Sequence, residues 1–99
     1  MSAGHSPSRG DLVRVHLIVT GRVQGVWYRQ SCKEVAVAAG VHGWVRNTAD
    51  GRVEAVLEGE RDAVDAVIGW MRVGPPHAVV DDVQLTVEPP EGARTFAVR

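Results

Sequence analysis

The stretch V-R-V-H-L-I-V-T-G-R-V-Q-G-V-W-Y-R, residues 13–29, changes its hydrophobic period part-way along and decides the fold. From Val13 to Thr20 it is rich in β-branched residues and every odd-numbered position is apolar, which predicts a strand with one apolar face. From Tyr28 onward the apolar residues recur at helical spacing. Two glycines, Gly21 and Gly25, separate these patterns and predict a short junction between the strand and a helix.

The rest of the chain repeats the same two periods and predicts a defined order of elements. The predicted elements are a helix from Tyr28 to the stop at Gly40, strands over residues 41–46 and 52–58, a helix over residues 60–73 and a strand over residues 79–88. The tight-turn pair Asp50-Gly51 joins the second strand to the third. A P-P-E-G turn precedes a short extra strand in the terminal T-F-A-V-R.

This order, β-α-β-β-α-β with a short additional C-terminal strand, indicates the fold class. Two helices can cover only one face of such a sheet, so we predict an α/β (α+β) two-layer sandwich with a ferredoxin-like, split βαβ arrangement. On the last long strand, Val83, Leu85 and Val87 are expected to point into the core. Residues 11–99 are expected to form one domain, preceded by a disordered tail over the small, polar residues 1–10.

Composition excludes several classes of function. The 99 residues include 11 basic and 12 acidic side chains, so the net charge of -1 gives no general electrostatic reason to bind nucleic acid or an anionic membrane. No stretch approaches the ~18 to 20 apolar residues that span a bilayer, and the first residues lack the apolar stretch of a signal peptide. We therefore expect a cytoplasmic monomer without a nucleic-acid or membrane partner.

Cysteine and histidine are too sparse for a metal centre. The single cysteine, Cys32, excludes an internal disulfide and a Cys-rich zinc site, and its place on the apolar stripe of the first helix favours a core role over that of a nucleophile. The four histidines show no short metal-ligand spacing: His5, His16, His42 and His77. Neither His16 nor His42 lies on a predicted site loop. We expect no metal and no cofactor.

The glycine junction is a candidate anion site. The first backbone N–H groups of a helix lack intrahelical partners, and glycines let the preceding loop curl so that further N–H groups converge. The candidate phosphate-binding residues are Gly21, Arg22, Val23, Gln24, Gly25, Val26, Trp27 and Tyr28. Arg29 follows on the first helical turn, where its guanidinium could bind two phosphate oxygens. The alternative is that the glycines serve chain reversal alone.

The junction differs from the familiar nucleotide signatures. It lacks the G-K-[ST] ending of a P-loop and the G-x-G-x-x-G of a dinucleotide fold, which favours a small phosphate-bearing ligand over ATP. A second candidate group lies in G-W-V-R-N-T-A-D-G-R-V-E, residues 43–54. Asn47 ends a strand near the same end of the predicted sheet, and its amide could orient a water molecule while contacting a phosphate oxygen. Alternatively, Asn47 is an ordinary turn residue that bonds its own backbone, and Thr48 braces the turn.

These two stretches together resemble the signature motifs of the acylphosphatase family. Further similarity lies in W-M-R-V-G-P-P-H-A-V-V-D-D-V, residues 70–83, and in the terminal F-A-V-R. The resemblance implies an enzyme that hydrolyses the carboxyl-phosphate bond of acyl phosphates to a carboxylate and inorganic phosphate. It also implies that Arg29 binds the phosphoryl group, that Asn47 positions the attacking water, and that residues 21–28 supply a cradle of backbone N–H groups.

Two departures from the family pattern and two other functions bear on this interpretation. Tyr28 stands where phenylalanine is common in the family. Many members have an aromatic residue after the last arginine, whereas this sequence stops at Arg99. An RNA-recognition domain has the same element order but needs exposed aromatic rings on its central strands, and residues 13–20 and 52–58 have none.

A domain that senses a phosphorylated metabolite could use the same cradle without the water-positioning Asn47. Trp27 either packs or lines the leaving-group side.

Overall fold

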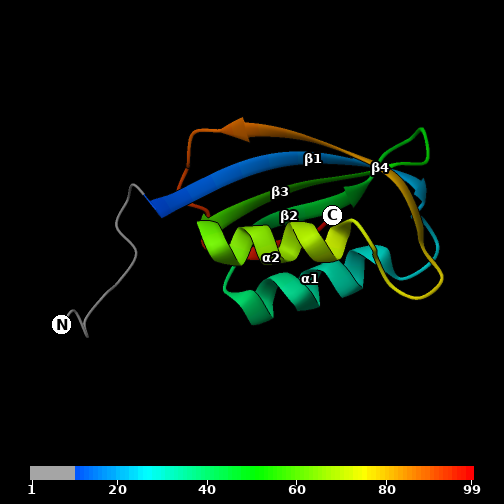
Figure 1. Cartoon of the computed structure of the whole chain (residues 1–99), viewed down its shortest axis with the longest axis horizontal. Helices are drawn as coiled ribbons and strands as arrows, with labels where there is room; N and C mark the ends of the chain where they lie inside the picture. Colours follow the sequence, from blue (N-terminus) through cyan, green and yellow to red (C-terminus); the bar gives the residue numbers. More distant parts are fainter. Residues whose placement is uncertain (1–10) are drawn as a thin grey trace.

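The computed structural model describes residues 11–99, so the tail predicted over residues 1–10 lies outside the described residues. The elements are β1 (Leu12–Arg22), α1 (Tyr28–Ala39), β2 (His42–Asn47), β3 (Val53–Glu60), α2 (Arg61–Met71), β4 (Val79–Glu88) and β5 (Phe96–Val98). The strands form one sheet in the order β4-β1-β3-β2-β5, and both helices cover the same face of it (Figure 1). The predicted two-layer sandwich with a short extra strand is confirmed.

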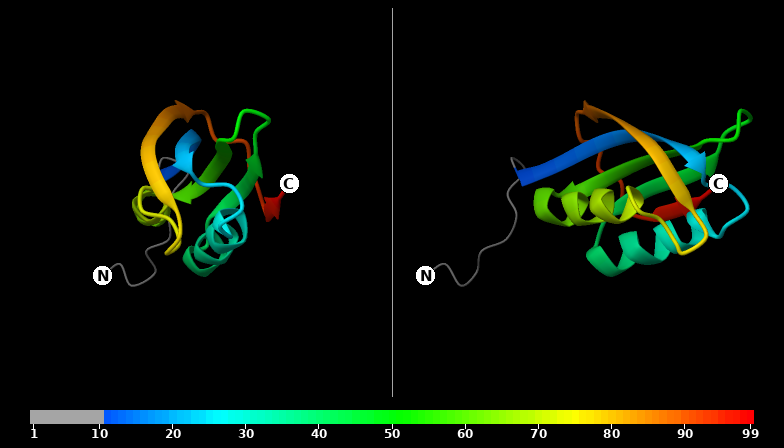
Figure 2. Two further views of the ribbon diagram at one scale, coloured as in Figure 1. Left: turned by 90° about the vertical axis from the view of Figure 1, so that its right-hand side faces the viewer. Right: turned by 45° about the vertical axis from the view of Figure 1, so that its right-hand side comes forward.

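Sheet topology brings two distant segments to the same end of the molecule. β1 and β2 both pair antiparallel with β3, so they run in the same direction and their C-terminal ends lie at the same end of the sheet. Val19 of β1 and Asn47 of β2 pair with the same residue, Val53 of β3. The junction after β1 and the turn after β2 therefore lie at one end of the sandwich (Figure 2). This arrangement places the two motifs of the sequence near one another.

The core lies between the sheet and the helices. The odd-numbered residues of β1 face the helices as predicted: Val15, Leu17 and Val19 are buried and Val13 is half-buried. The helices contribute buried side chains at helical spacing, which are Tyr28, Cys32 and Ala36 from α1 and Val64, Val67 and Met71 from α2. The Tyr28 hydroxyl donates a 2.7 Å hydrogen bond to the main-chain oxygen of Met71. Tyrosine at this position therefore links the two helices, a bond that phenylalanine cannot make.

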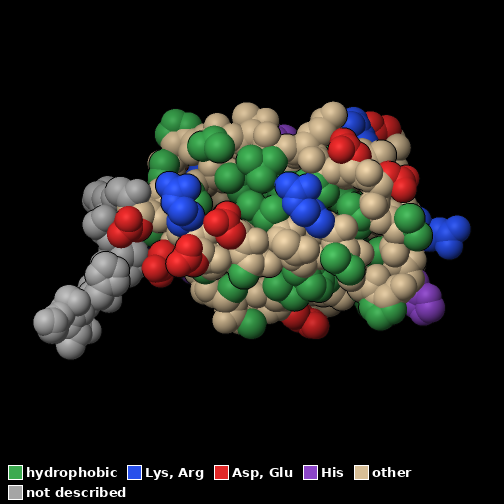
Figure 3. Space-filling model, in the orientation of Figure 1, with side chains coloured by type: hydrophobic (Ala, Val, Ile, Leu, Met, Phe, Trp, Pro, Cys, Tyr) green, Lys and Arg blue, Asp and Glu red, His purple; other side chains and the backbone are tan. Residues whose placement is uncertain are grey.

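The expectation that all three apolar residues of β4 lie in the core is wrong for two of them. Val83 is half-buried against the core, but Leu85 is 39% and Val87 74% exposed. Their register against Leu17 and Val15 places them on the helix side of the sheet. β4 is an edge strand, however, and this part of it lies beyond the cover of the helices; Figure 3 shows hydrophobic side chains exposed on this face.

The first glycine of the junction belongs to the sheet. β1 extends two residues further than predicted, to Arg22, and its register with β4 shifts between Thr20 and Gly21. Gly21 has φ 135°, and a Cβ atom there would lie 2.0 Å from the main-chain oxygen of Val79. Gly21 is therefore required for the close approach of β4.

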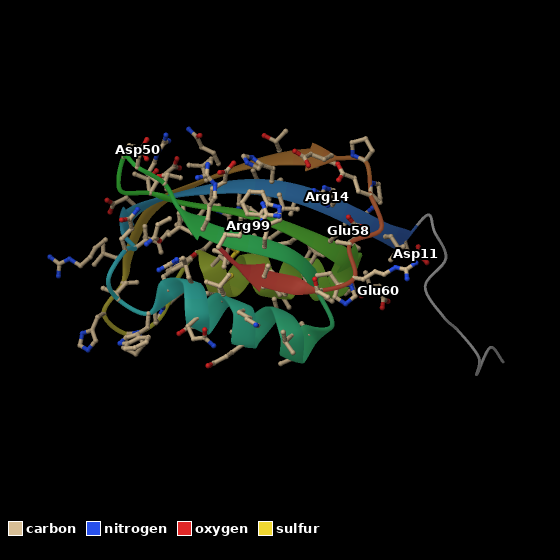
Figure 4. All side chains as sticks on the ribbon, turned by 180° about the vertical axis from the view of Figure 1, so that it is seen from behind. Asp11, Arg14, Asp50, Glu58, Glu60 and Arg99 are labelled. Atoms are coloured by element: carbon tan, nitrogen blue, oxygen red, sulfur yellow. The ribbon has the colours of Figure 1, made fainter. Side chains whose placement is uncertain are left out.

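A buried carboxylate on the open face of the sheet holds the segment that leads into β5. Arg14 Nη1 lies 2.9 Å from Glu58 Oε1 (Figure 4). The backbone N–H groups of Glu91, Gly92 and Ala93 also donate to the Glu58 carboxylate. Burial alone would raise the pKa of Glu58, but these N–H groups and Arg14 outweigh it and hold the pKa below its usual value.

Candidate active site

A cleft of about 430 Å³ opens at the end of the sandwich where β1 and β2 end. Three segments line it: the junction with the first turn of α1, the end of β2, and β5. The lining residues are Val23, Gly25, Trp27, Tyr28, Arg29, Gln30, Asn47 and Val98. The structure therefore brings Arg29 and Asn47 to one cleft. Four of the sequence-predicted phosphate-binding residues, Gly21, Arg22, Gln24 and Val26, are not among its lining residues.

The backbone of the junction presents unpaired donors. Gly25 has φ 73° and Trp27 has φ 67°, so two left-handed residues flank Val26. Among the described residues, no group accepts a hydrogen bond from the N–H of residues 24–27. The first bond of α1 runs from Ser31 N to Trp27 O, and the N–H groups of residues 28–30 likewise have no acceptor within residues 11–99. Alternating backbone conformation of this kind forms a concave nest that suits an anion.

Trp27 occupies the N-cap position of α1 without capping the helix. Its side chain makes no capping hydrogen bond, and the first turn of the helix contains no acidic residue. A non-glycine residue in the left-handed region costs about 1–3 kcal/mol. The indole is nevertheless 78% exposed, so core packing does not account for this conformation. The positive end of the helix dipole is consequently left open to a ligand.

The Arg29 guanidinium is oriented by the last residue of the sequence. Its Nη1 donates a 2.8 Å hydrogen bond to the main-chain oxygen of Arg99. Arg99 is fixed in turn, because its N–H donates to Val45 O at 2.8 Å and its guanidinium lies 4.5 Å from the centroid of the Trp44 ring. The remaining N–H groups of Arg29 have no acceptor among residues 11–99. They are available to an anion in the cleft.

Asn47 and Thr48 have different roles at the end of β2. The Thr48 hydroxyl accepts a hydrogen bond from Arg52 N at 3.0 Å, and the Thr48 N–H donates to Arg52 O at 2.8 Å. Thr48 thus closes the turn, as the sequence predicted of a bracing residue. The Asn47 side chain makes no hydrogen bond to any described residue, and its Oδ1 is buried. The alternative in which Asn47 bonds its own backbone is therefore not what the structure shows.

The Gln24 side chain joins the junction to this turn, a role that the sequence did not suggest. Its Nε2 donates hydrogen bonds of 2.8 Å to the main-chain oxygens of both Thr48 and Arg52. The sequence predicted Gln24 as a source of a backbone donor. Its amide instead fixes the distance between the N–H nest and the strand end that positions Asn47.

The other candidate nucleophiles lie away from the cleft. Cys32 is fully buried, and burial raises the pKa of its thiol to about 12, so the thiol is protonated at neutral pH. His16 Nε2 lies 2.6 Å from Glu54 Oε2 on the open face of the sheet. His42 Nδ1 lies 2.9 Å from Ala93 O. No side chain that commonly forms a phosphoryl-enzyme intermediate lines the site among the described residues.

Two features are absent from residues 11–99. No group of three or more His, Cys, Asp or Glu side chains is placed to hold a metal ion. No helix in this part of the chain is long and apolar enough to cross a membrane.

Comparison with known proteins decides the family. The family model described as Acylphosphatase matches residues 15–98, which include all of the fold except the first three residues of β1. The chain belongs to the acylphosphatase family. This confirms the resemblance seen in residues 21–29 and 43–54, and with it the class of enzyme, an acylphosphate phosphohydrolase.

Relatives in the acylphosphatase family match over nearly their whole length. An acylphosphatase from Trichormus variabilis is 53% identical over 95 residues, which cover 96% of this chain and 94% of the relative. One from Pyrobaculum arsenaticum is 60% identical over 83 residues, 83% of this chain and 87% of the relative. The solved structure of an acylphosphatase from Coxiella burnetii is similar with a TM-score of 0.89 and 35% identity, covering 96% of this chain and all of that one.

Proposed function

We propose that this acylphosphatase hydrolyses the carboxyl-phosphate bond of acyl phosphates by direct attack of water. In this proposal the N–H nest and Arg29 hold the phosphoryl group, and Asn47 holds the water. The observation that supports it most is the unpaired, partly buried amide of Asn47, which lines the same cleft as the free N–H groups of Arg29. Buried polar atoms in native structures nearly always have partners, so an unpaired one at a cleft suits a site that binds a ligand or a water.

The phosphoryl group would bind where positive charge is already arranged. Its oxygens would accept hydrogen bonds from the unpaired N–H groups of residues 24–30 and from the guanidinium of Arg29. The transition state of phosphoryl transfer spreads negative charge over these oxygens, so fixed donors stabilise it without rearrangement. The hydrogen bond to Arg99 would keep the guanidinium in place before the substrate arrives.

Asn47 would place the attacking water in line with the bond that breaks. Its Oδ1 would accept a hydrogen bond from the water, while its Nδ2 donates to a phosphate oxygen. The water oxygen then bonds to phosphorus, and the bond between phosphorus and the acyl oxygen breaks with its electron pair left on the carboxylate. The proton lost by the water goes to a phosphate oxygen. The products are one carboxylate and one inorganic phosphate.

The absence of a protein nucleophile from this route agrees with the chemistry of the substrate. An acyl phosphate is a mixed anhydride with a good leaving group, so placement of the water and neutralisation of charge are the main requirements. Cys32 and the described histidines are not needed for either requirement.

Steady-state hydrolysis of benzoyl phosphate, in the presence of a chelator, tests the proposal. We expect turnover by the native chain and a loss of about a hundredfold or more in kcat/KM for both Arg29→Ala and Asn47→Ala. Arg72→Ala removes an exposed arginine at the end of α2, outside the cleft, and is expected to leave kcat/KM unchanged.

Two outcomes would contradict the proposal. Native activity that persists in Asn47→Ala would remove the water-positioning role. Binding of inorganic phosphate without any turnover by the native chain would instead support a phosphate-sensing domain, since the N–H nest serves that function equally well.

A further inference from the structure

The cleft is lined by apolar side chains as well as by the groups assigned to the phosphoryl group and the water. Two of these apolar lining residues, Trp27 and Val98, have 78% and 37% of their surfaces exposed. Val23 and Tyr28, which are both buried, complete the apolar lining. Trp27 belongs to the junction and Val98 to β5, two segments that line one cleft only in the folded molecule.

Among the described residues, the Trp27 indole has no aromatic or cationic side chain as a contact partner. The aromatic pair formed by the described residues joins Tyr28 to Trp70, and the contact between a cation and a ring joins Arg99 to Trp44. Trp27 takes part in neither. A large ring that is exposed at the rim of a cleft, on a residue with a strained backbone, is typical of a surface that binds a ligand.

Charge on the lining restricts what can bind beside Trp27. Among the described residues that line the cleft, Arg29 is the one with a charged side chain, and the proposed function assigns it to the phosphoryl group. No carboxylate and no second cation is present in the lining to pair with a charged acyl group. The apolar lining therefore favours an uncharged, apolar acyl group, for which an indole offers area and stacking.

We propose that Trp27 and Val98 form the acyl-group subsite and give aromatic acyl phosphates a higher kcat/KM than small aliphatic ones. This inference rests on the proposed function. A phosphoryl group in the nest contacts the backbone on both sides of Trp27, so the acyl group, one oxygen away from phosphorus, lies within reach of the indole of the same residue. Specificity would then come from the side chain of a residue whose N–H belongs to the phosphate nest.

The ratio of kcat/KM for benzoyl phosphate to that for acetyl phosphate tests the subsite. Trp27→Gly removes the ring and tolerates the left-handed backbone, so we expect this ratio to fall about tenfold. Trp27→Phe should keep most of the native ratio, and Val98→Ala should lower the ratio by a smaller factor than Trp27→Gly does. Val73→Ala, which trims a 70% exposed apolar residue outside the cleft, should leave the ratio at the native value.

The outcomes separate this inference from the proposed function. If the native chain and Trp27→Gly hydrolyse both substrates with the same ratio, the enzyme is an acyl phosphate hydrolase and the subsite is wrong. Trp27→Gly could instead weaken inhibition by inorganic phosphate and leave the benzoyl-to-acetyl ratio of kcat/KM unchanged. That result would also overturn the subsite, because it would mean that Trp27 affects only phosphate binding in the nest. If the native chain hydrolyses neither substrate, the proposed function itself fails.

Discussion

Asn47 and its neighbour Thr48 show how a turn can leave one side chain without a structural hydrogen bond. Thr48 makes the hydrogen bonds that close the β2–β3 turn, and Gln24 donates to two of the turn's main-chain oxygens. The backbone at Asn47 is therefore held without any help from its own side chain. An amide that is positioned but unpaired can bind water with little loss of entropy, which is the condition that proximity catalysis requires.

Arg29→Lys tests whether the shape of the guanidinium matters as well as its charge. Lysine is a point charge, and it cannot donate to Arg99 O while holding two phosphate oxygens in a fixed fork. We expect kcat/KM for benzoyl phosphate to fall on the order of a thousandfold, close to the effect of Arg29→Ala. Steady-state kinetics would measure it. A lysine variant within about tenfold of native would show that charge alone suffices.

Arg29 and Asn47 were candidates on their chemistry, and the resemblance of their two motifs to the acylphosphatase signature implied their roles; the structure brings them to one cleft. It could not predict the hydrogen bonds of the Gln24 amide, since the distance from a loop residue to a turn in another motif depends on the whole fold. The same reason applies to Val98, which faces the cleft only because β5 pairs with β2.

At the scale of the elements, the two glycines of the first motif have separate purposes. Gly25 has a left-handed backbone and open space around it, which fits a loop residue at a binding site. Gly21 lies in β1 against the backbone of β4. Their spacing in the sequence resembles one Gly-rich loop, and spacing alone could not separate a glycine needed for close strand packing from one needed for loop shape.

Gly21→Ala would test this assignment through stability. The new Cβ atom would meet the main-chain oxygen of Val79, so we expect the free energy of unfolding to fall by about 2–4 kcal/mol. Gly69→Ala is the matched control, because Gly69 lies in α2 with nothing within 4 Å of its added Cβ, and alanine should stabilise the helix by about 0.5–1 kcal/mol. Urea unfolding would measure both. Equal effects of the two changes would contradict the close approach.

The hydrophobic pattern and the turn signals predicted the type and order of the elements, and the short β5 was predicted from its place after the P-P-E-G turn. It did not predict that Leu85 and Val87 are exposed. Periodicity shows which face of a strand is apolar, whereas burial also depends on whether a helix covers that part of the sheet. For an edge strand such as β4, cover is decided by the lengths and positions of elements elsewhere in the chain.

At the scale of the whole molecule, Glu58 links pH to stability. Its pKa is held below the usual value of about 4.3, so the ionised carboxylate stabilises the fold above that pH, and this stabilisation is lost as the pH falls through the lower folded pKa. We expect Glu58→Gln to lower the free energy of unfolding by about 2–3 kcal/mol at pH 7. The difference from the native chain should become much smaller near pH 3.

Urea denaturation at the two pH values would measure this difference. Subtracting the free energy of unfolding of the variant from that of the native chain removes the contributions of other carboxylates. Glu54 is one of them, and the main cause of its lowered pKa is its hydrogen bond to His16. A destabilisation by Glu58→Gln that is the same at pH 7 and pH 3 would mean that packing, and not charge, accounts for the effect.

The order of the strands also governs when the molecule can form. β1 is the first strand of the described residues, yet one of its partners is β4, and β5 completes the far edge. Of the neighbouring strand pairs, β2 and β3 alone are joined by a short turn. Closing such long loops is slow, because chain entropy is lost before the strand contacts are gained. During synthesis, β1 must therefore wait until β4 has emerged before the sheet can close around it.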